Sequence, residues 1–354
     1  MSEKVLMKGN EALAEAAMRA GCRFFFGYPI TPQTEVAAYM AKHMRKNGGT
    51  YLQAESEIAA INMVLGASSA GMRVLTSSSS PGISLKGEGI SYLAGSDLPA
   101  VIINIQRGGP GLGGIQPSQS DYFQATRGLG HGDFHVIVVA PSTVQEMVNL
   151  TYDAFDMADL YRMPVMILGD GILGQMMEPA EFPTESSRKL PPKDWATNGT
   201  HGKRKKNIVN SLYLAPDELE RTNFERFERY AKIKATEQKA ECFMTDDADI
   251  VIVAYGAAAR VAKNAVLAAR EQGIRVGIVR PITLWPFPED TLKKVSATAK
   301  AFLSVELSMG QMIEDVKLAI DCSRPVYLCN RTGGMVMKPD EVLAKIKEIA
   351  GGLK

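Results

Sequence analysis

The chain has 354 residues and 45% of them are hydrophobic, so it can bury a full core and has the length of two domains. Its formal net charge of +1 gives no reason to expect a nucleic acid or an anionic membrane as a partner. No apolar run reaches the ~18 residues of a membrane span, and no early segment has the pattern of an export signal. We therefore expect a soluble protein of the cytoplasm without membrane contact.

The cysteines and histidines do not form a pattern that predicts a metal site. There are four cysteines, and the closest pair, Cys322 and Cys329, is seven positions apart. Without a Cys-x-x-Cys motif the chain alone cannot build a zinc knuckle or a ferredoxin-type cluster, and free thiols are typical of a reducing cytoplasm. His131 and His135 lie in an expected loop, so we predict no metal there. The basic run 203–206 is expected to be a solvated loop or a subunit contact.

The first half of the sequence alternates between short apolar runs and helical stretches with apolar residues at three-to-four spacing. This pattern is typical of a buried parallel sheet with right-handed crossovers, and we assign it to a unit over 1–185. Thr31 followed by Pro32 predicts a helix start, with Thr31 as the cap. The expected strands are 22–26, 50–53, 73–77, 100–105, 136–140 and 165–168, and expected helices are 11–20, 34–44 and 58–70.

Residues 186–247 interrupt this alternation and are expected to form a linker. Its first part is polar and rich in turn signals. Its second part, 216–241, is charged, with apolar residues at three-residue steps, so we expect an amphipathic helix lying across two domains or against a partner. A second α/β unit over 248–354 follows, with strands expected at 250–254, 275–279, 301–305 and 326–328.

Three turns of the first unit should meet at one edge of its sheet. They are the segments 27–32, 55–60 and 76–82, and each follows an apolar run and precedes a helical pattern. The carboxyl ends of parallel strands share an edge, where open α/β sheets bind their ligands. A carboxylate at Glu57, beside small hydroxyl and glycine groups, fits the activation of an aminopyrimidine. That chemistry points to thiamine diphosphate.

Glu57 is the side chain expected to do this work. Thiamine-dependent enzymes activate the cofactor through its own 4′-amino group, which requires a carboxylate hydrogen-bonded to N1′ of the pyrimidine. Partial burial suits this carboxylate because desolvation raises its pKa towards that of its partner. Glu57 opens a helix of small and apolar residues, which predicts burial. The alternative is an ordinary acidic residue favoured by the helix dipole, and Glu55 competes for the catalytic role.

Thr31 and Arg107 are candidates for binding the substrate. Thr31 lies at the expected sheet edge, where its hydroxyl can donate to a carboxylate or carbonyl, although helix capping alone also explains it. Arg107 ends the strand and enters the glycine-rich segment 108–114, where a guanidinium can hold a 2-oxo acid carboxylate through a bidentate pair. The alternative is an ordinary loop arginine paired with an acidic neighbour.

One further motif is expected to be a coincidence. Gly169-Asp170-Gly171 followed by Asn198 is similar to the metal-diphosphate motif of thiamine enzymes. In that motif a buried helix and a strand precede the Asn, whereas here a polar linker does. We therefore expect another chain to hold the diphosphate and its Mg²⁺.

Together these motifs resemble the α subunits of 2-oxoacid:ferredoxin oxidoreductases, over nearly the whole chain. The second unit looks like their transketolase C-terminal domain, and the linker around 195–200 looks most like the branched-chain, 2-oxoisovalerate members. The resemblance rests on the segment 27–32, the Glu57 helix, the turn 80–82 and the segment 106–110, with 280–281 and 306–311 in the second unit.

The resemblance implies an α/β fold: a thiamine-diphosphate pyrimidine domain with a doubly wound parallel sheet, plus a smaller transketolase C-terminal-like domain. Ser79 and Ser80 replace the Ser-Gly commonly found before Pro-Gly, a departure that affects the pocket wall near the pyrimidine. The implied site residues are Tyr28, Pro29, Glu57 and Ser80 for the cofactor, with Glu57 catalytic, and Thr31 and Arg107 for the substrate carboxylate.

The implied reaction is oxidative decarboxylation of a branched-chain 2-oxo acid to acyl-CoA and CO2, with reduction of ferredoxin and coenzyme A as co-substrate. Thiamine diphosphate would be shared with an iron–sulfur β subunit, and Mg²⁺ and [4Fe-4S] clusters would lie in partner subunits, which include a γ and a ferredoxin-like subunit. Two alternatives are a subunit of an NAD-linked 2-oxoacid dehydrogenase complex and a non-catalytic scaffold subunit. The segments 27–32 and 107–110 argue against the first, and intact Glu57, Thr31 and Arg107 argue against the second.

Overall fold

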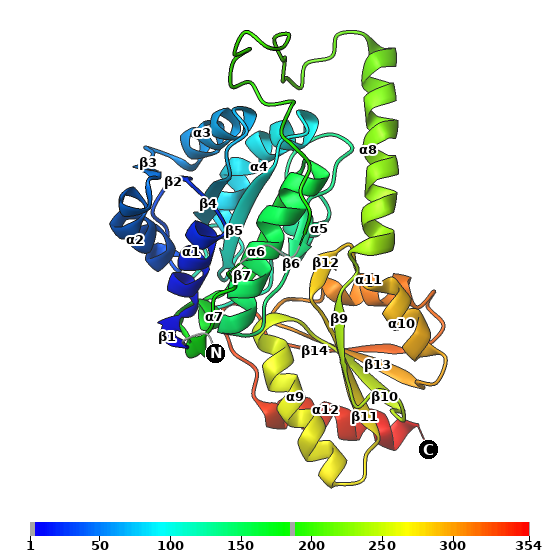
Figure 1. The fold of residues 1–354 in the computed structure, drawn as a ribbon. Helices are drawn as coiled ribbons and strands as arrows, with labels where there is room; N and C mark the ends of the chain where they lie inside the picture. Colours follow the sequence, from blue (N-terminus) through cyan, green and yellow to red (C-terminus); the bar gives the residue numbers. More distant parts are fainter. Residues whose placement is uncertain (1–3, 185–187, 354) are drawn as a thin grey trace.

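The computed structural model describes residues 4–184 and 188–353, and it confirms an α/β fold (Figure 1). A seven-stranded sheet has the order β12-β6-β7-β5-β4-β2-β3, and all its neighbours are parallel except β12 and β6. Its strands are β2 (Phe24–Gly27), β3 (Thr50–Gln53), β4 (Val74–Ser78), β5 (Ala100–Gln106), β6 (Ile137–Val139), β7 (Pro164–Asp170) and β12 (Thr283–Trp285).

Helices cover both faces of this sheet. α1 packs with α6, and α3 packs with α4, and the two pairs lie on opposite faces (Figure 1). β5 and β7 are buried at every residue, as expected for parallel strands covered on two sides. The helices of this unit are α1 (Gly9–Arg19), α2 (Thr34–His43), η1 (Arg45–Asn47), α3 (Glu57–Ser69), α4 (Ser80–Gly95), α5 (Tyr122–Thr126), α6 (Val144–Tyr161) and α7 (Gly171–Gln175).

The start of α2 differs from the prediction. The helix begins at Thr34, with Gln33 at the N-cap position, so Thr31 is not its cap. The cause is a turn ahead of the helix, in which the backbone N–H of Gln33 donates to the carbonyl of Ile30 at 3.2 Å. The side chain of Asn10 holds this turn by donating to the carbonyl of Pro32 at 3.0 Å. Thr31 therefore lies exposed in the turn, and its hydroxyl does not cap the helix.

The C-terminal part builds a second, five-stranded sheet in the order β14-β13-β10-β11-β9. Helices α9 and α12 pack together, as do α10 and α11. The elements are β9 (Ala240–Phe243), β10 (Ile250–Val253), α9 (Gly256–Glu271), β11 (Val276–Pro281), α10 (Glu289–Ser296), β13 (Ala301–Glu306), α11 (Met312–Ala319), β14 (Val326–Asn330) and α12 (Pro339–Gly352). A two-stranded antiparallel ladder joins β1 (Val5–Lys8) to β8 (Met177–Ala180).

The long helix predicted over 216–241 ends early. It is α8 (Pro216–Thr236), and the residues after it form β9, which pairs antiparallel with β11. In β9 the hydrogen bonds to β11 take the place of helical hydrogen bonds. The sequence pattern alone did not reveal this pairing. Of the predicted apolar stripe, Tyr230 and Ile233 are buried while Phe224 is 67% exposed, so only the end of α8 near the sheets packs against them (Figure 1).

The two parts of the chain are joined by one strand that the C-terminal part contributes to the first sheet. β12 comes from the C-terminal part of the chain yet extends the first sheet by pairing with β6. Next to it, the backbone N–H of Ala140 donates to the carbonyl of Ile282 at 2.8 Å. An aromatic cluster covers this seam, where His135 stacks on Trp285 at 4.6 Å and Tyr230 of α8 packs edge-on against both. Burial lowers the pKa of His135 to about 4, so this imidazole is a neutral packing group.

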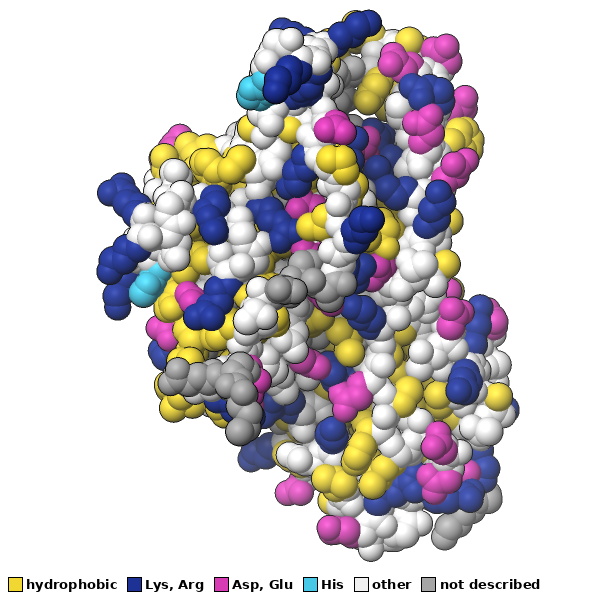
Figure 2. All heavy atoms as spheres, in the orientation of Figure 1, with side chains coloured by type: hydrophobic (Ala, Val, Ile, Leu, Met, Phe, Trp, Pro, Cys, Tyr) yellow, Lys and Arg dark blue, Asp and Glu magenta, His cyan; other side chains and the backbone are white. Residues whose placement is uncertain are grey.

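The surface shows mixed charge. Figure 2 shows acidic and basic side chains interspersed over much of the face it presents. This agrees with the formal net charge of +1. Among the residues that the structure describes, no helix combines the length and the apolar character needed to span a membrane.

Candidate active site

The carboxyl ends of β2, β4 and β5 bring the predicted site residues to one edge of the large sheet. The side chain of Arg107, just after β5, donates through Nη1 to the carbonyl of Thr31 at 3.2 Å. Its backbone N–H donates to the hydroxyl of Ser80, at the start of α4, at 3.1 Å. Ser80 lies two residues from Gly82, which contacts the carboxylate of Glu57. The structure therefore gathers Thr31, Arg107, Ser80 and Glu57 from four separate segments.

Glu57 is the first residue of α3, and only 6% of its surface is exposed. The preceding residue, Ser56, caps the helix by accepting from the backbone N–H of Ala59 at 3.1 Å. Glu57 is therefore not needed as the cap, and its carboxylate accepts no hydrogen bond from the part of the chain that the structure describes. The competing acid, Glu55, is exposed to solvent. A buried carboxylate without a donor is costly, and a ligand that brings a donor would relieve that cost.

Gly82 allows α4 to approach this carboxylate. A Cβ atom at position 82 would lie 2.6 Å from Oε1 of Glu57 and would also collide with Oγ of Ser78. Only glycine fits such a close approach. The buried hydroxyls of Thr76 and Ser78 in β4, and of Ser79 at the N-cap of α4, also have no hydrogen-bond partner within the described residues. Together with the carboxylate of Glu57, these hydroxyls offer hydrogen-bond donors and acceptors of the kind that an aminopyrimidine ring can use.

Ser80 is held by a buried polar network. Its hydroxyl donates to Oδ2 of Asp121 at 2.6 Å, and the side-chain amide of Asn104 donates to the same oxygen at 2.9 Å. Burial raises the pKa of Asp121, while these hydrogen bonds and the charge of Arg107 act in the opposite direction. The hydroxyl of Ser80 is thus engaged within the protein. Its φ of +23° lies in the left-handed region, which glycine adopts most readily.

Asn104 and Asp121 were missed by sequence reasoning. Asn104 is a polar residue inside the apolar run of β5, and it is fully buried. A buried amide needs partners, so its place within an apolar strand was the available signal. Asp121 follows the glycine-rich loop and carries no comparable signal.

The guanidinium of Arg107 is buried, with 7% of the residue exposed. Nη1 and Nη2 donate to the carbonyls of Thr31 and Leu112, but the buried Nε has no partner within the described residues. Asp121, whose carboxyl feels the charge of Arg107, already accepts from Ser80 and Asn104. Arg107 therefore presents a positive charge that no ion pair neutralises in the described part of the chain, which suits an anionic ligand such as a carboxylate.

Tyr28 and Pro29 lie in the turn after β2, where Tyr28 is half-buried and Pro29 is exposed. A residue that the sequence reasoning did not single out, Gln33, ties this turn to the next strand. Its amide donates to the carbonyl of Tyr28 at 3.2 Å and accepts from the hydroxyl of Ser77 at 2.5 Å. Gln33 thereby fixes the distance between the turn and the end of β4.

Asp170, of the Gly-Asp-Gly motif, is used for the fold. Its Oδ1 accepts from the backbone N–H groups of Ile172 and Leu173, so it caps α7, and Oδ2 accepts from the N–H of Ala257 at the start of α9. Burial raises the pKa of this carboxyl, and the three backbone donors oppose the rise. Asn198, the other half of the motif, accepts from Arg204 instead. Among the described residues no group of three or more His, Cys, Asp or Glu side chains is arranged to hold a metal ion.

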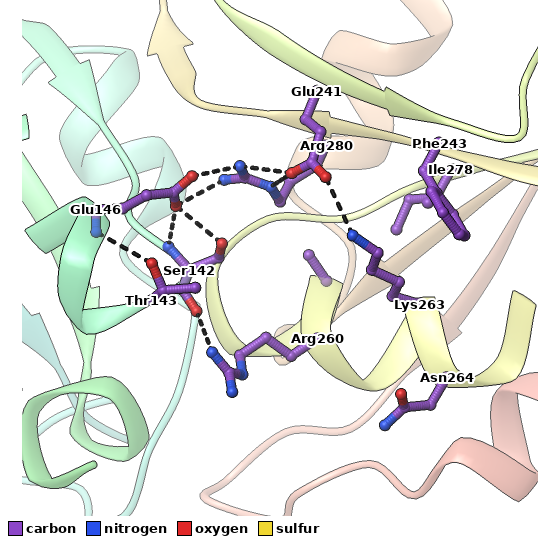
Figure 3. A pocket seen from close by; sticks show the side chains of 11 residues that line it. Ser142, Thr143, Glu146, Glu241, Phe243, Arg260, Lys263, Asn264, Ile278 and Arg280 are labelled. Atoms are coloured by element: carbon purple, nitrogen blue, oxygen red, sulfur yellow. Dashed lines mark hydrogen bonds and ion pairs between the residues drawn. The ribbon is translucent and has the colours of Figure 1, made fainter. Parts of the chain in front are cut away.

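A second polar hollow lies where the two sheets' units meet. It is a cavity of about 390 Å³ between the start of α6, β9, β11 and α9 (Figure 3). Its basic side chains are all paired: Arg280 contacts Glu146 at 2.6 Å and Glu241 at 2.8 Å, and Lys263 contacts Glu241 at 3.2 Å. Arg260 is also paired, with Glu178 at 2.9 Å. Since these charges are neutralised within the chain, we interpret the hollow as a structural junction.

Comparison with known proteins assigns both parts of the chain. Residues 15–242 match the family described as pyruvate flavodoxin/ferredoxin oxidoreductase, thiamine-diphosphate-binding. Residues 248–342 match the family described as pyruvate:ferredoxin oxidoreductase core domain II. The two matches together cover most of the chain.

Two relatives are similar over nearly their whole length. Ketoisovalerate oxidoreductase subunit VorB of Methanothermobacter thermautotrophicus is 51% identical over 98% of each chain. 2-Oxoglutarate synthase subunit KorA of Methanothermobacter marburgensis is 37% identical over 98% of this chain and 99% of its own.

Two solved structures share the fold. 2-Oxoglutarate:ferredoxin oxidoreductase from Magnetococcus marinus, with 2-oxoglutarate, coenzyme A and succinyl-CoA bound, superposes with a TM-score of 0.88 at 29% identity. The match covers 98% of this chain and 65% of that one, so the chain spans about two thirds of the solved relative's length. A split-gene transketolase is similar in fold alone, with a TM-score of 0.60 at 13% identity. The family resemblance predicted from the sequence is thus confirmed: the chain belongs to the pyruvate flavodoxin/ferredoxin oxidoreductase family, as a subunit of the 2-oxoacid:ferredoxin oxidoreductase type.

Proposed function

We propose that this chain supplies the activating carboxylate and part of the substrate pocket of a thiamine-diphosphate-dependent 2-oxoacid:ferredoxin oxidoreductase that acts on a branched-chain 2-oxo acid. The reaction yields acyl-CoA and CO2 and reduces ferredoxin. The observation that carries the proposal is the burial of Glu57, whose carboxylate accepts no hydrogen bond within the described residues, at the same sheet edge as Arg107. The buried Nε of Arg107 has no partner within the described residues either. The branched-chain substrate is favoured by the 51% identity to a ketoisovalerate oxidoreductase subunit, against 37% for a 2-oxoglutarate synthase subunit.

The roles of the residues follow from their surroundings. Thiamine diphosphate, when bound, supplies a ring carbon acid that becomes the nucleophile towards the 2-oxo carbonyl. Glu57 shares a proton with N1′ of the pyrimidine, and its burial keeps water from competing for that hydrogen bond. Arg107 binds the substrate carboxylate through its charge, and Thr31, exposed beside it, donates its hydroxyl to the same end of the substrate. Tyr28, Pro29 and the turn at Ser80 form the wall of the cofactor site.

The partners follow from what this chain's residues already do. Asp170 is occupied by three backbone N–H groups, so we assign the diphosphate and its Mg²⁺ to an iron–sulfur β subunit. The [4Fe-4S] clusters, a γ subunit and a ferredoxin-like subunit would complete the path of electrons to ferredoxin. Coenzyme A is the acyl acceptor, in line with the coenzyme A bound to the solved relative. The unpaired cysteines support a reducing compartment, and we place the complex in the cytoplasm.

The test is turnover of the reconstituted complex with oxoisovalerate, pyruvate and 2-oxoglutarate, using ferredoxin or a viologen against NAD as the electron acceptor. We expect oxoisovalerate to give the highest kcat/KM and NAD to be inactive. Glu57→Gln should lower kcat by about 10²–10⁴-fold, the usual range for a lost acid–base group. The matched control, Glu55→Gln at the exposed neighbour, should leave kcat unchanged. Full turnover of Glu57→Gln, or reduction of NAD, would contradict the proposal.

A further inference from the structure

Lys86 has no evident structural reason to be where it is. It lies on α4, has no exposed surface, and its Nζ atom has no hydrogen-bond partner within the described residues. Lysine is almost never fully buried without a partner, because an ammonium group loses its hydration there. Nothing in the core requires this amine, since an apolar side chain of equal length would fill the same space at lower cost.

The geometry connects Lys86 to Glu57. Lys86 comes four residues after Gly82 on α4, so both lie on the same face of the helix. Helical side chains point back towards the N-terminus, and this direction leads from Lys86 to Gly82, which contacts the carboxylate of Glu57. Glu57 is also the one charged group among the described residues found to act on the titration of Lys86. The two charges thus face each other across the contact between α3 and α4.

From this arrangement we infer that Lys86 is a positioning residue for cofactor activation: its buried ammonium is the positive charge facing Glu57 that favours transfer of the shared proton from the Glu57 carboxyl to N1′ of the pyrimidine. The inference rests on the proposed contact between Glu57 and N1′. Lys86 acts through Glu57 and does not itself touch the cofactor.

The chemistry balances as a single proton transfer. When the proton moves from the carboxyl of Glu57 to N1′, the carboxylate becomes anionic and the ring becomes cationic. A nearby ammonium stabilises the carboxylate that this transfer leaves behind. A ring protonated at N1′ has a more acidic 4′-amino group, which is the group that must lose a proton to form the imino tautomer.

The titration of Lys86 sets the pH range in which this works. Burial lowers the pKa of Lys86 from 10.5 to about 8, and the charge of Glu57 opposes that fall. The ammonium is therefore present at neutral pH and is lost as the pH rises through about 8. We expect its support of Glu57 to be lost over the same range.

The experiment compares Lys86→Met with wild type in the reconstituted complex. Two quantities are measured between pH 6 and 9: the Kd for thiamine diphosphate, and the imino and amino bands of the bound cofactor by near-ultraviolet circular dichroism. Lys86→Met should lower the ratio of imino to amino form at pH 7 by about tenfold, the effect of removing one opposite charge near a carboxylate. The difference from wild type should shrink above pH 8. Lys42→Met, at an exposed lysine of α2, is the matched control and should behave as wild type.

A double-mutant cycle separates this role from a structural one. The Glu57→Gln variant has no carboxyl on which the charge of Lys86 can act. The double variant Glu57→Gln/Lys86→Met should therefore have the same Kd for the cofactor as Glu57→Gln alone. If Lys86 had only a structural role, Lys86→Met would weaken cofactor binding by the same factor in wild type and in Glu57→Gln. If Lys86→Met reduces the yield of folded complex, Lys86→Gln keeps a polar side chain of similar length and removes the same charge.

The outcomes distinguish the two proposals. If Glu57→Gln changes neither cofactor binding nor turnover, the proposed role of Glu57 fails, and that of Lys86 fails with it. If Glu57→Gln abolishes turnover while Lys86→Met leaves the imino-to-amino ratio and its pH dependence at wild-type values, the role of Glu57 stands and the inference about Lys86 is overturned.

Discussion

The sheet edge and the junction between the two units both gather polar and charged side chains, yet they treat their charges in opposite ways. At the junction, Arg280 is shared between Glu146 and Glu241. At the edge, Glu57 is buried and its carboxylate accepts no hydrogen bond within the described chain. The buried Nε of Arg107 has no hydrogen-bond partner there either. Folding pairs the charges at the junction but leaves the groups at the sheet edge without hydrogen-bond partners. Groups that the fold buries but does not pair are the ones available to a ligand.

The largest effect is expected when the space beside Glu57 is filled. Gly82→Ala places a methyl group 2.6 Å from Oε1 of Glu57. Alanine normally stabilises a helix relative to glycine by about 0.5–1 kcal/mol, so a gain in stability would show that the site is loose. We expect instead that the carboxylate is displaced and that kcat falls by about 10²-fold, since small misplacements at a reacting centre have effects of that size.

The measurement is steady-state turnover together with a thermal melt of the complex. Gly351→Ala, in the last turn of α12 where a Cβ meets open space, is the matched control. Unchanged turnover in Gly82→Ala would mean that the carboxylate does not need its observed position.

A second test concerns the unpaired guanidinium. Arg107→Met should raise KM for the 2-oxo acid and lower kcat/KM by about 10–10²-fold, the value of one hydrogen bond to a charged group. Arg107→Lys keeps the charge but loses the planar fork, so it should recover only part of that loss. The measurement is kcat/KM for oxoisovalerate with each variant. Equal kcat/KM for wild type and Arg107→Met would show that the substrate carboxylate binds elsewhere.

The junction should respond in the opposite sense, through stability and not through chemistry. Arg280 is 8% exposed at its side chain, while Glu146 and Glu241 are partly exposed at 25% and 42%. Removing the arginine leaves Glu146 without its ion-pair partner and Glu241 with Lys263 alone, and we expect Arg280→Met to lower the free energy of unfolding by about 1–3 kcal/mol.

Its control is Arg275→Met, whose ion pair with Asp249 is largely exposed, with the arginine side chain 55% accessible. That variant should lose about 0–1 kcal/mol. Denaturant unfolding measures both, and kcat of the folded Arg280→Met complex should remain at the wild-type value. A large fall in kcat without a fall in stability would place chemistry at the junction.

The last expected effect is a pH dependence of stability from Lys86. Its pKa falls from 10.5 in the unfolded chain to about 8 in the folded one, so between these values the folded chain binds fewer protons and its stability rises with pH. Below pH 8 the buried ammonium of Lys86 lowers the free energy of unfolding by its full amount. Lys86→Met should therefore be more stable than wild type at pH 7, by about 1–3 kcal/mol, and the gap should narrow above pH 8. A gap that stays constant from pH 6 to 10 would contradict the titration.

Much of the fold followed from sequence because local patterns decided it. The strand over 50–53 was predicted at its observed bounds, and most others lie within two residues of them. The addition of β12 to the first sheet was not predictable, because the pairing of Thr283 with Val139 joins residues far apart in the chain. The early end of α8 was missed for the same reason, since β9 gains its hydrogen bonds from β11.

In the site, too, the local patterns were predictable and the contacts between distant segments were not. The motifs around Glu57, Thr31 and Arg107 were visible as residues placed after apolar strands. Their supporting partners were not, because Gln33, Asn104 and Asp121 act through side-chain contacts between segments. The sequence pattern did not single out Lys86, and only the packing of α4 against α3 shows that it is buried.

The central claim is that the carboxylate of Glu57 meets the pyrimidine of thiamine diphosphate. A structure of the assembled complex with the cofactor bound tests it most directly. We expect Oε1 or Oε2 of Glu57 to lie within about 2.6–3.2 Å of N1′, the distance of a hydrogen bond that can transfer a proton. A bound cofactor whose N1′ contacts a different acid, with Glu57 still buried against Gly82 alone, would contradict it.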